Sequence, residues 1–191
     1  MNTSLTEKQI EDYSRDGFVA HRGLLSTEEV NTLKTAVLDT IATMGRKKVA
    51  GGNDDMEEGD GYYDKVFTQR LNLWRINDTV KDFMLNPAIG AMLKQLEGVD
   101  FRVWHDQALI KEPFGNPTAW HLDNPYWSFY SRQSVSIWIA LEPATYQNGC
   151  MYFIPGTQKL ASYENVGINE NLSGLFKVYP AMAEIDPVGV P

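Results

Sequence analysis

Residues 120–127 read Trp-His-Leu-Asp-Asn-Pro-Tyr-Trp, and this stretch carries the clearest chemical signal in the chain. On a β-strand, His121 and Asp123 would project from the same face, because side chains two residues apart point the same way. A neighbouring imidazole and carboxylate supply two thirds of the 2-His-1-carboxylate set that holds non-haem Fe(II) and leaves coordination positions open. The alternative interpretation is a surface histidine beside an aspartate, and the surrounding sequence has to decide between the two.

The segments around this stretch alternate apolar and polar residues, a pattern typical of β-strands. The alternation runs over residues 101–110 before the stretch and over residues 134–142 after it. Two shorter strands are predicted at residues 151–154 and 175–179. After Gly98 the chain is therefore predicted to consist mainly of strands.

The residues before Gly98 carry the signals of helices. Thr6 with Gln9 and Ser26 with Glu29 match the capping box that begins a helix. Apolar residues recur at helical spacing after each box. Pro87 fits the first turn of a further helix, because proline is favoured at that position.

The length of 191 residues leaves room for one ordinary domain. We expect residues 1–98 to be mainly helical and residues 99–191 to be mainly strand. Helices first and antiparallel strands afterwards predict an α+β domain whose sheets form a sandwich or a barrel.

Composition excludes several classes of function. The chain has 17 basic and 25 acidic residues, a net charge of −8, which argues against binding nucleic acid or an anionic membrane surface. The acidic stretch 53–60 departs from the EF-hand template, so we expect a solvated loop there rather than a calcium site. Cys150 is the only cysteine, and no targeting or membrane-spanning segment is visible, so we expect a cytoplasmic protein.

Further short motifs surround the His-Leu-Asp triplet in a fixed order. In chain order they are Asp16-Gly17-Phe18-Val19, Lys111-Glu112-Pro113, His121-Leu122-Asp123, Tyr126-Trp127, Asn148-Gly149-Cys150 and Pro155-Gly156-Thr157-Gln158-Lys159. Each piece is ordinary, but their joint order is specific. Over residues 5–159 the sequence resembles the phytanoyl-CoA dioxygenase family of Fe(II)- and 2-oxoglutarate-dependent oxygenases.

The resemblance implies a single oxygenase domain over residues 1–191, with N-terminal helices packed on a double-stranded β-helix, or jelly roll. It assigns iron ligation to His121 and Asp123. The resemblance also implies that 2-oxoglutarate is bound by Gln107, Lys111 and Trp138. It implies that the substrate is bound by Tyr126 and Trp127.

Several of these assignments have an equally plain structural interpretation. Trp138, Tyr126 and Trp127 could be packing residues, and Lys111 could be a lysine facing solvent at a strand end. His105 is the best internal candidate for another ligand, but a hydrogen-bonded strand histidine is the favoured interpretation.

The activity implied by the resemblance is hydroxylation of a small organic substrate by O₂ and 2-oxoglutarate, with succinate and CO₂ as co-products. No partner protein is inferred. Two alternatives stay open: a non-catalytic jelly-roll module that binds a small ligand, and a cupin-like metalloenzyme that does not use 2-oxoglutarate.

The chain departs from the family pattern in one respect. The family supplies a second histidine ligand and a 2-oxoglutarate-binding arginine downstream, whereas no histidine follows His121 and no arginine follows Arg132 here. We therefore expect a fragment that lacks the C-terminal part of the jelly roll and has weak or no turnover.

Overall fold

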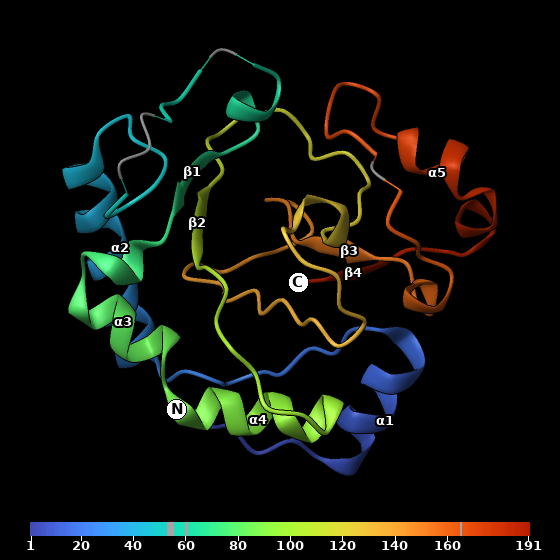
Figure 1. Ribbon diagram of the computed structural model, residues 1–191, viewed down its shortest axis with the longest axis horizontal. Helices are drawn as coiled ribbons and strands as arrows, with labels where there is room; N and C mark the ends of the chain where they lie inside the picture. The colour runs from blue at the N-terminus through green and yellow to red at the C-terminus, as the bar shows by residue number, and fades with distance from the viewer. Residues whose placement is uncertain (53–55, 60, 165) are drawn as a thin grey trace. The chain divides into compact units, whose positions relative to one another are not determined.

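The computed structural model describes residues 1–52, 56–59, 61–164 and 166–191 (Figure 1). Half of the acidic stretch 53–60 that was expected to form a solvated loop, namely residues 53–55 and 60, lies outside these described residues. Helices and short antiparallel strands are both present, as an α+β class requires. No helix among the described residues is long and apolar enough to cross a membrane.

Residue contacts divide the chain into two compact units, which are described separately. The first unit comprises Met1–Thr3, Gly23–Lys94 and Gly98–Pro117. The second unit comprises the remaining residues, namely Ser4–Arg22, Gln95–Glu97 and Thr118–Pro191. The expected organisation as one domain over residues 1–191 stays a prediction.

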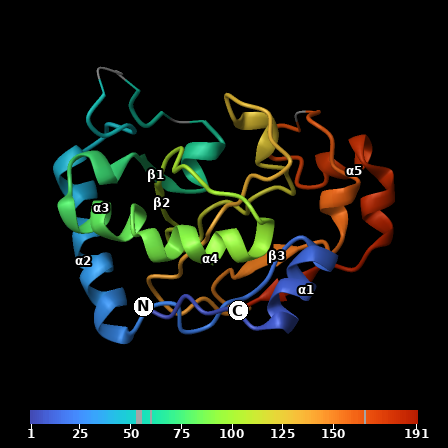
Figure 2. The same cartoon turned by 60° about the horizontal axis from the view of Figure 1, so that its bottom comes forward.

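The first unit contains the three helices α2 (Thr27–Met44), α3 (Asp78–Met84) and most of α4 (Pro87–Glu97). The capping box predicted at Ser26 is present, and Pro87 occupies the first turn of α4 as expected. Helices α2 and α3 pack against each other, and they lie side by side in Figures 1 and 2.

The sheet of the first unit consists of β1 (Thr68–Leu71) and β2 (Gln107–Ile110), paired antiparallel with Leu71 opposite Gln107. Just before β2, the buried Asp106 carboxylate accepts hydrogen bonds from the backbone N–H groups of Leu73 and Trp74, at 3.1 and 3.3 Å. Burial raises the pKa of Asp106, while these N–H groups oppose the rise. Asp106 therefore fixes a turn of the first unit.

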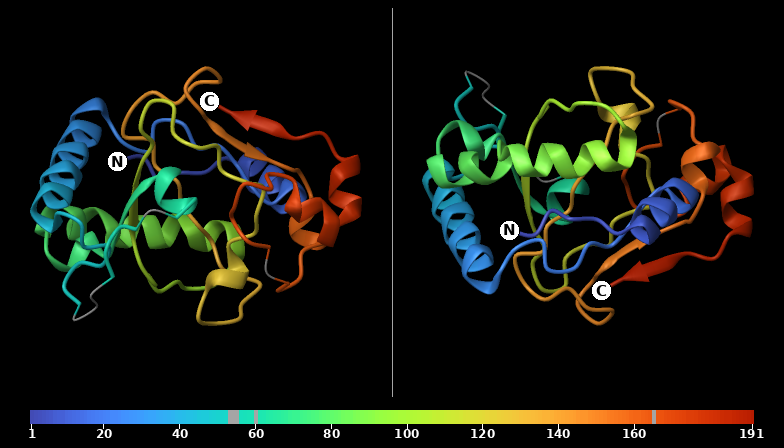
Figure 3. Two further views of the ribbon diagram at one scale, coloured as in Figure 1. Left: turned by 90° about the horizontal axis from the view of Figure 1, so that it is seen from above. Right: turned by 90° about the horizontal axis from the view of Figure 1, so that it is seen from below.

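The second unit contains α1 (Glu7–Asp16), α5 (Gly174–Val178) and the antiparallel strands β3 (Met151–Phe153) and β4 (Val188–Val190). Figure 3 shows β4 in red beside β3 in orange. The capping box predicted at the start of α1 is present. The core of this unit is a cluster of the buried side chains Ile154, Val166, Leu175, Tyr179 and Met182.

Motifs that lie far apart in the sequence meet in the second unit. Gly17 ends α1 with φ +83°, a left-handed conformation that glycine adopts without strain. A Cβ at this position would stand 2.6 Å from Oε1 of Gln158. The Gln158 side chain donates hydrogen bonds to the carbonyls of Ser14 and Arg15, both at 3.3 Å. Phe18 stacks on Phe153 with ring centroids 4.5 Å apart.

Several strand predictions were wrong. Residues 175–179 largely form the helix α5, and residues 134–142 form no strand. Of residues 101–110, only the last four form a strand, β2. An alternating pattern becomes a strand only where a second chain segment supplies hydrogen-bond partners, and the described part of residues 99–191 pairs over short stretches alone.

The two sheets of the described residues have two strands each. They do not by themselves establish a jelly roll, which is built from eight strands. The mixed helix and sheet architecture is thus confirmed, and the jelly roll stays a prediction.

The contact between Gly17 and Gln158 yields a test by substitution. Gly17→Ala should destabilise the protein by about 2–3 kcal/mol, because it adds steric overlap to left-handed strain. Gly23→Ala is the matched control: it has φ +74° but nothing within 4 Å of its Cβ position, so only the strain of about 1–2 kcal/mol is expected. Urea denaturation measures both, and equal losses would contradict the proposed close packing.

Candidate functional site

In the segment 120–123, side chains that pack against the core alternate with side chains that solvent reaches. Trp120 and Leu122 pack against the core cluster of the second unit. The backbone N–H of Trp120 donates to the Leu172 carbonyl at 3.1 Å, which holds the segment in place. Because Trp120 and Leu122 face the core, the side chains of His121 and Asp123 point away from it.

His121 and Asp123 face each other. Nε2 of His121 lies 3.3 Å from Oδ1 of Asp123. The imidazole side chain is 26% exposed and the carboxylate side chain 53% exposed, so both are accessible to solvent. This pair matches the expected proximity, although the residues do not lie on a strand: Asp123 leads directly into a 3₁₀ turn over Asn124–Tyr126.

A backbone carbonyl fixes the orientation of the imidazole. Ala119 is buried, and its carbonyl lies 2.8 Å from Nδ1 of His121. A carbonyl can only accept a hydrogen bond, so Nδ1 carries a proton and donates it. In the neutral ring, the lone pair is therefore on Nε2, the nitrogen that faces Asp123.

Both carboxylate oxygens of Asp123 have a neighbouring polar group. The hydroxyl of Ser136 donates to Oδ2 at 3.3 Å, while Oδ1 faces the imidazole. The sequence analysis missed Ser136 and Ala119. A signal for Ser136 existed, because it shares the alternating face of residues 134–142 with Trp138, which the resemblance assigns to the co-substrate.

Opposing effects act on the pKa of His121. Burial favours the neutral ring, but the hydrogen bond and negative charge of Asp123, together with the Ala119 carbonyl, outweigh it and raise the pKa of His121. Without a metal, a proton is thus stabilised between the two side chains. A cation that accepts the Nε2 lone pair would occupy the same position in place of this proton.

No group of three or more His, Cys, Asp or Glu side chains that could hold a metal ion is found among the described residues. The other two histidines lie elsewhere. His21 is within 3.1 Å of the Gln9 side-chain nitrogen, and His105 of the first unit contacts the Trp104 ring. Among the described residues, His121 and Asp123 are thus close to each other, and their role as metal ligands stays a prediction.

The second unit also contains the predicted Trp138, Tyr126 and Trp127. Trp138 is 49% exposed and Tyr126 is 46% exposed, so neither is a core residue. The Tyr126 hydroxyl donates to the Val166 carbonyl at 2.7 Å. Trp127 stacks on Phe129.

The two remaining predicted residues, Gln107 and Lys111, lie in the first unit. The Gln107 side-chain oxygen accepts a hydrogen bond from Gln69 at 2.9 Å. The Lys111 ammonium donates to the Asn116 carbonyl at 2.7 Å and lies 4.9 Å from the centre of the Phe67 ring. Burial lowers the pKa of Lys111.

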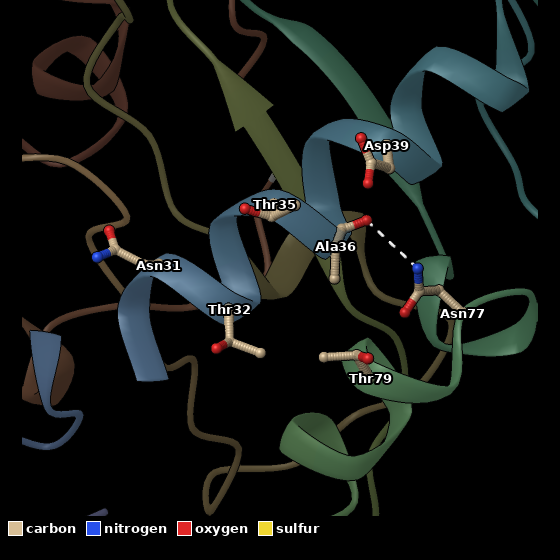
Figure 4. Close-up of a pocket in the computed structure, with 7 residues that line it drawn as sticks. All are labelled: Asn31, Thr32, Thr35, Ala36, Asp39, Asn77 and Thr79. Carbon is tan, nitrogen blue, oxygen red and sulfur yellow. Dashed lines mark hydrogen bonds between the residues drawn. The ribbon is translucent and has the colours of Figure 1, made fainter. Parts of the chain in front are cut away.

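A separate open groove of about 520 Å³ lies in the first unit (Figure 4). Its lining comes from α2 and the start of α3 and is mostly hydroxyl and amide: Asn31, Thr32, Thr35, Ala36, Asp39, Asn77 and Thr79. The Asn77 side chain is already engaged, because it donates to Ala36 and Thr40 and caps α3. None of the predicted site residues lines this groove.

Comparison with known proteins identifies relatives over most of the chain. The model of the phytanoyl-CoA dioxygenase (PhyH) family matches residues 13–172. The chain is 35% identical over 82 residues to the dioxygenase lolE1 of Epichloe uncinata, covering 43% of this chain and 32% of that protein. It is 23% identical to phytanoyl-CoA dioxygenase domain-containing protein 1 of Danio rerio, covering 80% and 65%.

A solved structure has a similar fold. It is the non-heme alpha ketoglutarate dependent carbocyclase SnoK from nogalamycin biosynthesis, with a TM-score of 0.72 and 23% sequence identity. The similarity covers 98% of this chain and 70% of the SnoK chain. The chain spans between about one third and two thirds of the length of the two curated relatives.

The geometry around His121 yields a test that needs no metal. Asp123→Asn should lower the pKa of His121, because the charge that stabilises the imidazolium is removed. A raised histidine pKa stabilises the fold below the unfolded-state pKa, and this contribution is lost as the pH rises through the folded-state pKa. In the variant this pH-dependent contribution should shrink. NMR titration of the His121 ring proton measures the pKa, and an unchanged value would contradict the pairing.

Proposed function

The chain belongs to the phytanoyl-CoA dioxygenase family. From this we propose that His121 and Asp123 are two of the protein ligands in the Fe(II) site of a 2-oxoglutarate-dependent dioxygenase. The family is one of 2-oxoglutarate-dependent dioxygenases. The proposed reaction is hydroxylation of a small organic substrate, with O₂ and 2-oxoglutarate consumed and succinate and CO₂ formed.

The observation that carries the proposal is the 3.3 Å approach of Nε2 of His121 to Oδ1 of Asp123, with Nδ1 held by the Ala119 carbonyl. Metal-binding histidines ordinarily donate their other ring N–H to a carbonyl or carboxylate, which fixes the tautomer and the ring orientation. One imidazole nitrogen and one carboxylate oxygen form a mixed donor set that suits Fe(II), whereas Mg²⁺ and Ca²⁺ prefer oxygen alone. The residues present therefore fit the metal.

Each residue has a defined task in this proposal. Bound iron would supply the redox chemistry that activates O₂, and the protein supplies ligands and orientation. His121 presents a neutral nitrogen, and Asp123 contributes a negative charge that offsets part of the dication's charge. Ser136 donates to the second carboxylate oxygen and so limits rotation of Asp123.

The co-substrate and substrate contacts of Gln107, Lys111, Trp138, Tyr126 and Trp127 stay proposals. The Lys111 ammonium is a suitable partner for a carboxylate, but it would have to exchange its hydrogen bond to Asn116 for that partner. A complete site also requires a third protein ligand, which the family pattern supplies from a second histidine.

Metal binding tests the two proposed ligands directly. Mn(II), a redox-inactive substitute for Fe(II), is titrated into the protein in the presence of 2-oxoglutarate, and the free ion is followed by EPR. His121→Ala and Asp123→Asn should each weaken binding at least about tenfold. Asp186→Asn replaces another exposed carboxylate of the same unit and is the matched control.

The proposed site is supported if Asp186→Asn binds Mn(II) like the wild type while His121→Ala and Asp123→Asn both bind it more weakly. Wild-type binding in both His121→Ala and Asp123→Asn would overturn it. A non-catalytic binding module would still bind its small ligand when the metal-binding residues are replaced.

Turnover provides a second measurement. Incubated with Fe(II), O₂ and 2-oxoglutarate, the 191-residue chain should form succinate slowly, because two protein ligands hold iron less firmly than three. The rate should fall in acid, since His121 must be neutral to bind iron. Rapid turnover would contradict the expectation of a weakly held metal, and equal rates for the wild type and His121→Ala would contradict the proposed site.

A further inference from the structure

The residues that follow Asp123 form a short turn that closes back on it. This 3₁₀ turn comprises Asn124–Tyr126, and we call it the 124–126 turn. The backbone N–H of Tyr126 donates to the carbonyl of Asp123 at 3.0 Å. Pro125 is the middle residue of the turn, and its ring fixes the backbone angle φ. The position of the turn therefore helps to determine where the backbone of Asp123 lies.

Two side chains hold the 124–126 turn to neighbouring backbone carbonyls. The Tyr126 hydroxyl donates to the Val166 carbonyl at 2.7 Å. The Asn124 side-chain amide donates to the Ser162 carbonyl at 3.2 Å. Both acceptors are backbone groups, which do not change position when a side chain rotates. The turn thus has one side-chain anchor at each of its two ends.

The two accepting residues are connected to the core of the second unit. Val166 is buried and belongs to the core cluster. Tyr179 is another member of that cluster, and its hydroxyl oxygen lies 2.7 Å from the Ser162 hydroxyl oxygen. The same Tyr179 hydroxyl accepts a hydrogen bond from the Ser162 backbone N–H at 3.3 Å. A continuous set of contacts therefore runs from the core to the 124–126 turn.

Such support matters for Asp123 because its carboxylate side chain is 53% exposed. The contacts of this carboxylate to His121 and Ser136, both at 3.3 Å, orient the group at the end of the side chain. Metal affinity also depends on how firmly the surrounding residues hold each ligand in place. On one side of Asp123 the chain is held by Leu122, which packs against the core, and on the other side by the 124–126 turn.

From these contacts we propose that Asn124 and Tyr126 are positioning residues, which set the place of Asp123 in the metal site through the turn that follows it. The inference rests on the proposed function in taking Asp123 as a metal ligand. It adds Asn124, for which the sequence suggested no role. It also gives the Tyr126 hydroxyl a task other than the substrate contact that the resemblance implies.

The titration of the 191-residue chain with Mn(II) in the presence of 2-oxoglutarate tests this positioning. Tyr126→Phe removes only the hydroxyl, and Asn124→Ala removes the amide. Each should weaken Mn(II) binding about tenfold, which is the lower end of the range for groups that support metal ligands. Because no substrate is present, a Tyr126 hydroxyl that acted on the substrate alone would leave Mn(II) binding unchanged. Asn124→Ala keeps the test valid if Tyr126→Phe does not fold.

Tyr146→Phe is the matched control for an effect on stability alone. Tyr146 belongs to the same unit, and its hydroxyl also donates to a backbone carbonyl, that of Gly189, at 3.3 Å. Both tyrosine variants lose one hydrogen bond from a hydroxyl to a carbonyl, so both should lower the urea concentration at the midpoint of unfolding. Only Tyr126→Phe should weaken Mn(II) binding, and this difference separates positioning from a general loss of stability.

Amide hydrogen exchange measures the effect on the turn without a metal. In Asn124→Ala the backbone N–H of Tyr126 should exchange at least about tenfold faster than in the wild type, because a turn that loses an anchor opens more often. In Tyr146→Phe the same N–H should exchange as in the wild type.

Three results would overturn the inference. They are wild-type Mn(II) binding by folded Tyr126→Phe or Asn124→Ala, equal losses of Mn(II) binding in Tyr126→Phe and Tyr146→Phe, and unchanged exchange of the Tyr126 N–H in Asn124→Ala. Any of them, found together with weak binding by His121→Ala and Asp123→Asn, would leave the proposed metal site intact. Wild-type binding by His121→Ala and Asp123→Asn would overturn the proposed function and this inference together.

Discussion

The site depends on one short-range constraint: Trp120 and Leu122 pack into the core of the second unit, which leaves His121 and Asp123 together on the other side. The Ala119 carbonyl then selects the imidazole tautomer, so that the lone pair of the neutral ring is on the nitrogen beside Asp123. Packing of apolar side chains against the core thus sets the direction of His121 and Asp123. The hydrogen bond to the Ala119 carbonyl sets which ring nitrogen of His121 can bind a metal.

The same logic explains how much the sequence could predict. The capping boxes at Thr6 and Ser26 locate the starts of α1 and α2, because both the side chain and the backbone groups they satisfy are local. The proximity of His121 and Asp123 was predicted from their spacing. It holds because Leu122 between them packs against the core, which has the same effect on its two neighbours as a strand would have.

Features that depend on distant partners were not predictable. Residues 134–142 have the pattern of a strand, yet a strand also requires a neighbouring segment with which to pair. Residues 175–179 are apolar enough to form either a strand or a helix. In the structure most of them form the helix α5, and Leu175 packs in the core. The Ser136 contact with Asp123 spans thirteen positions: the alternating pattern places Ser136 on the same face as Trp138, but it does not identify Asp123 as the partner.

The central claim, that His121 binds a metal through Nε2 while Nδ1 donates to Ala119, can be observed with Co(II) as a paramagnetic substitute for iron. Proton NMR in water should show one strongly shifted, slowly exchanging imidazole N–H resonance that is absent in His121→Gln. The hydrogen bond to the buried Ala119 slows its exchange. A shifted N–H resonance that persists in this variant, and so belongs to His21 or His105, would contradict the account.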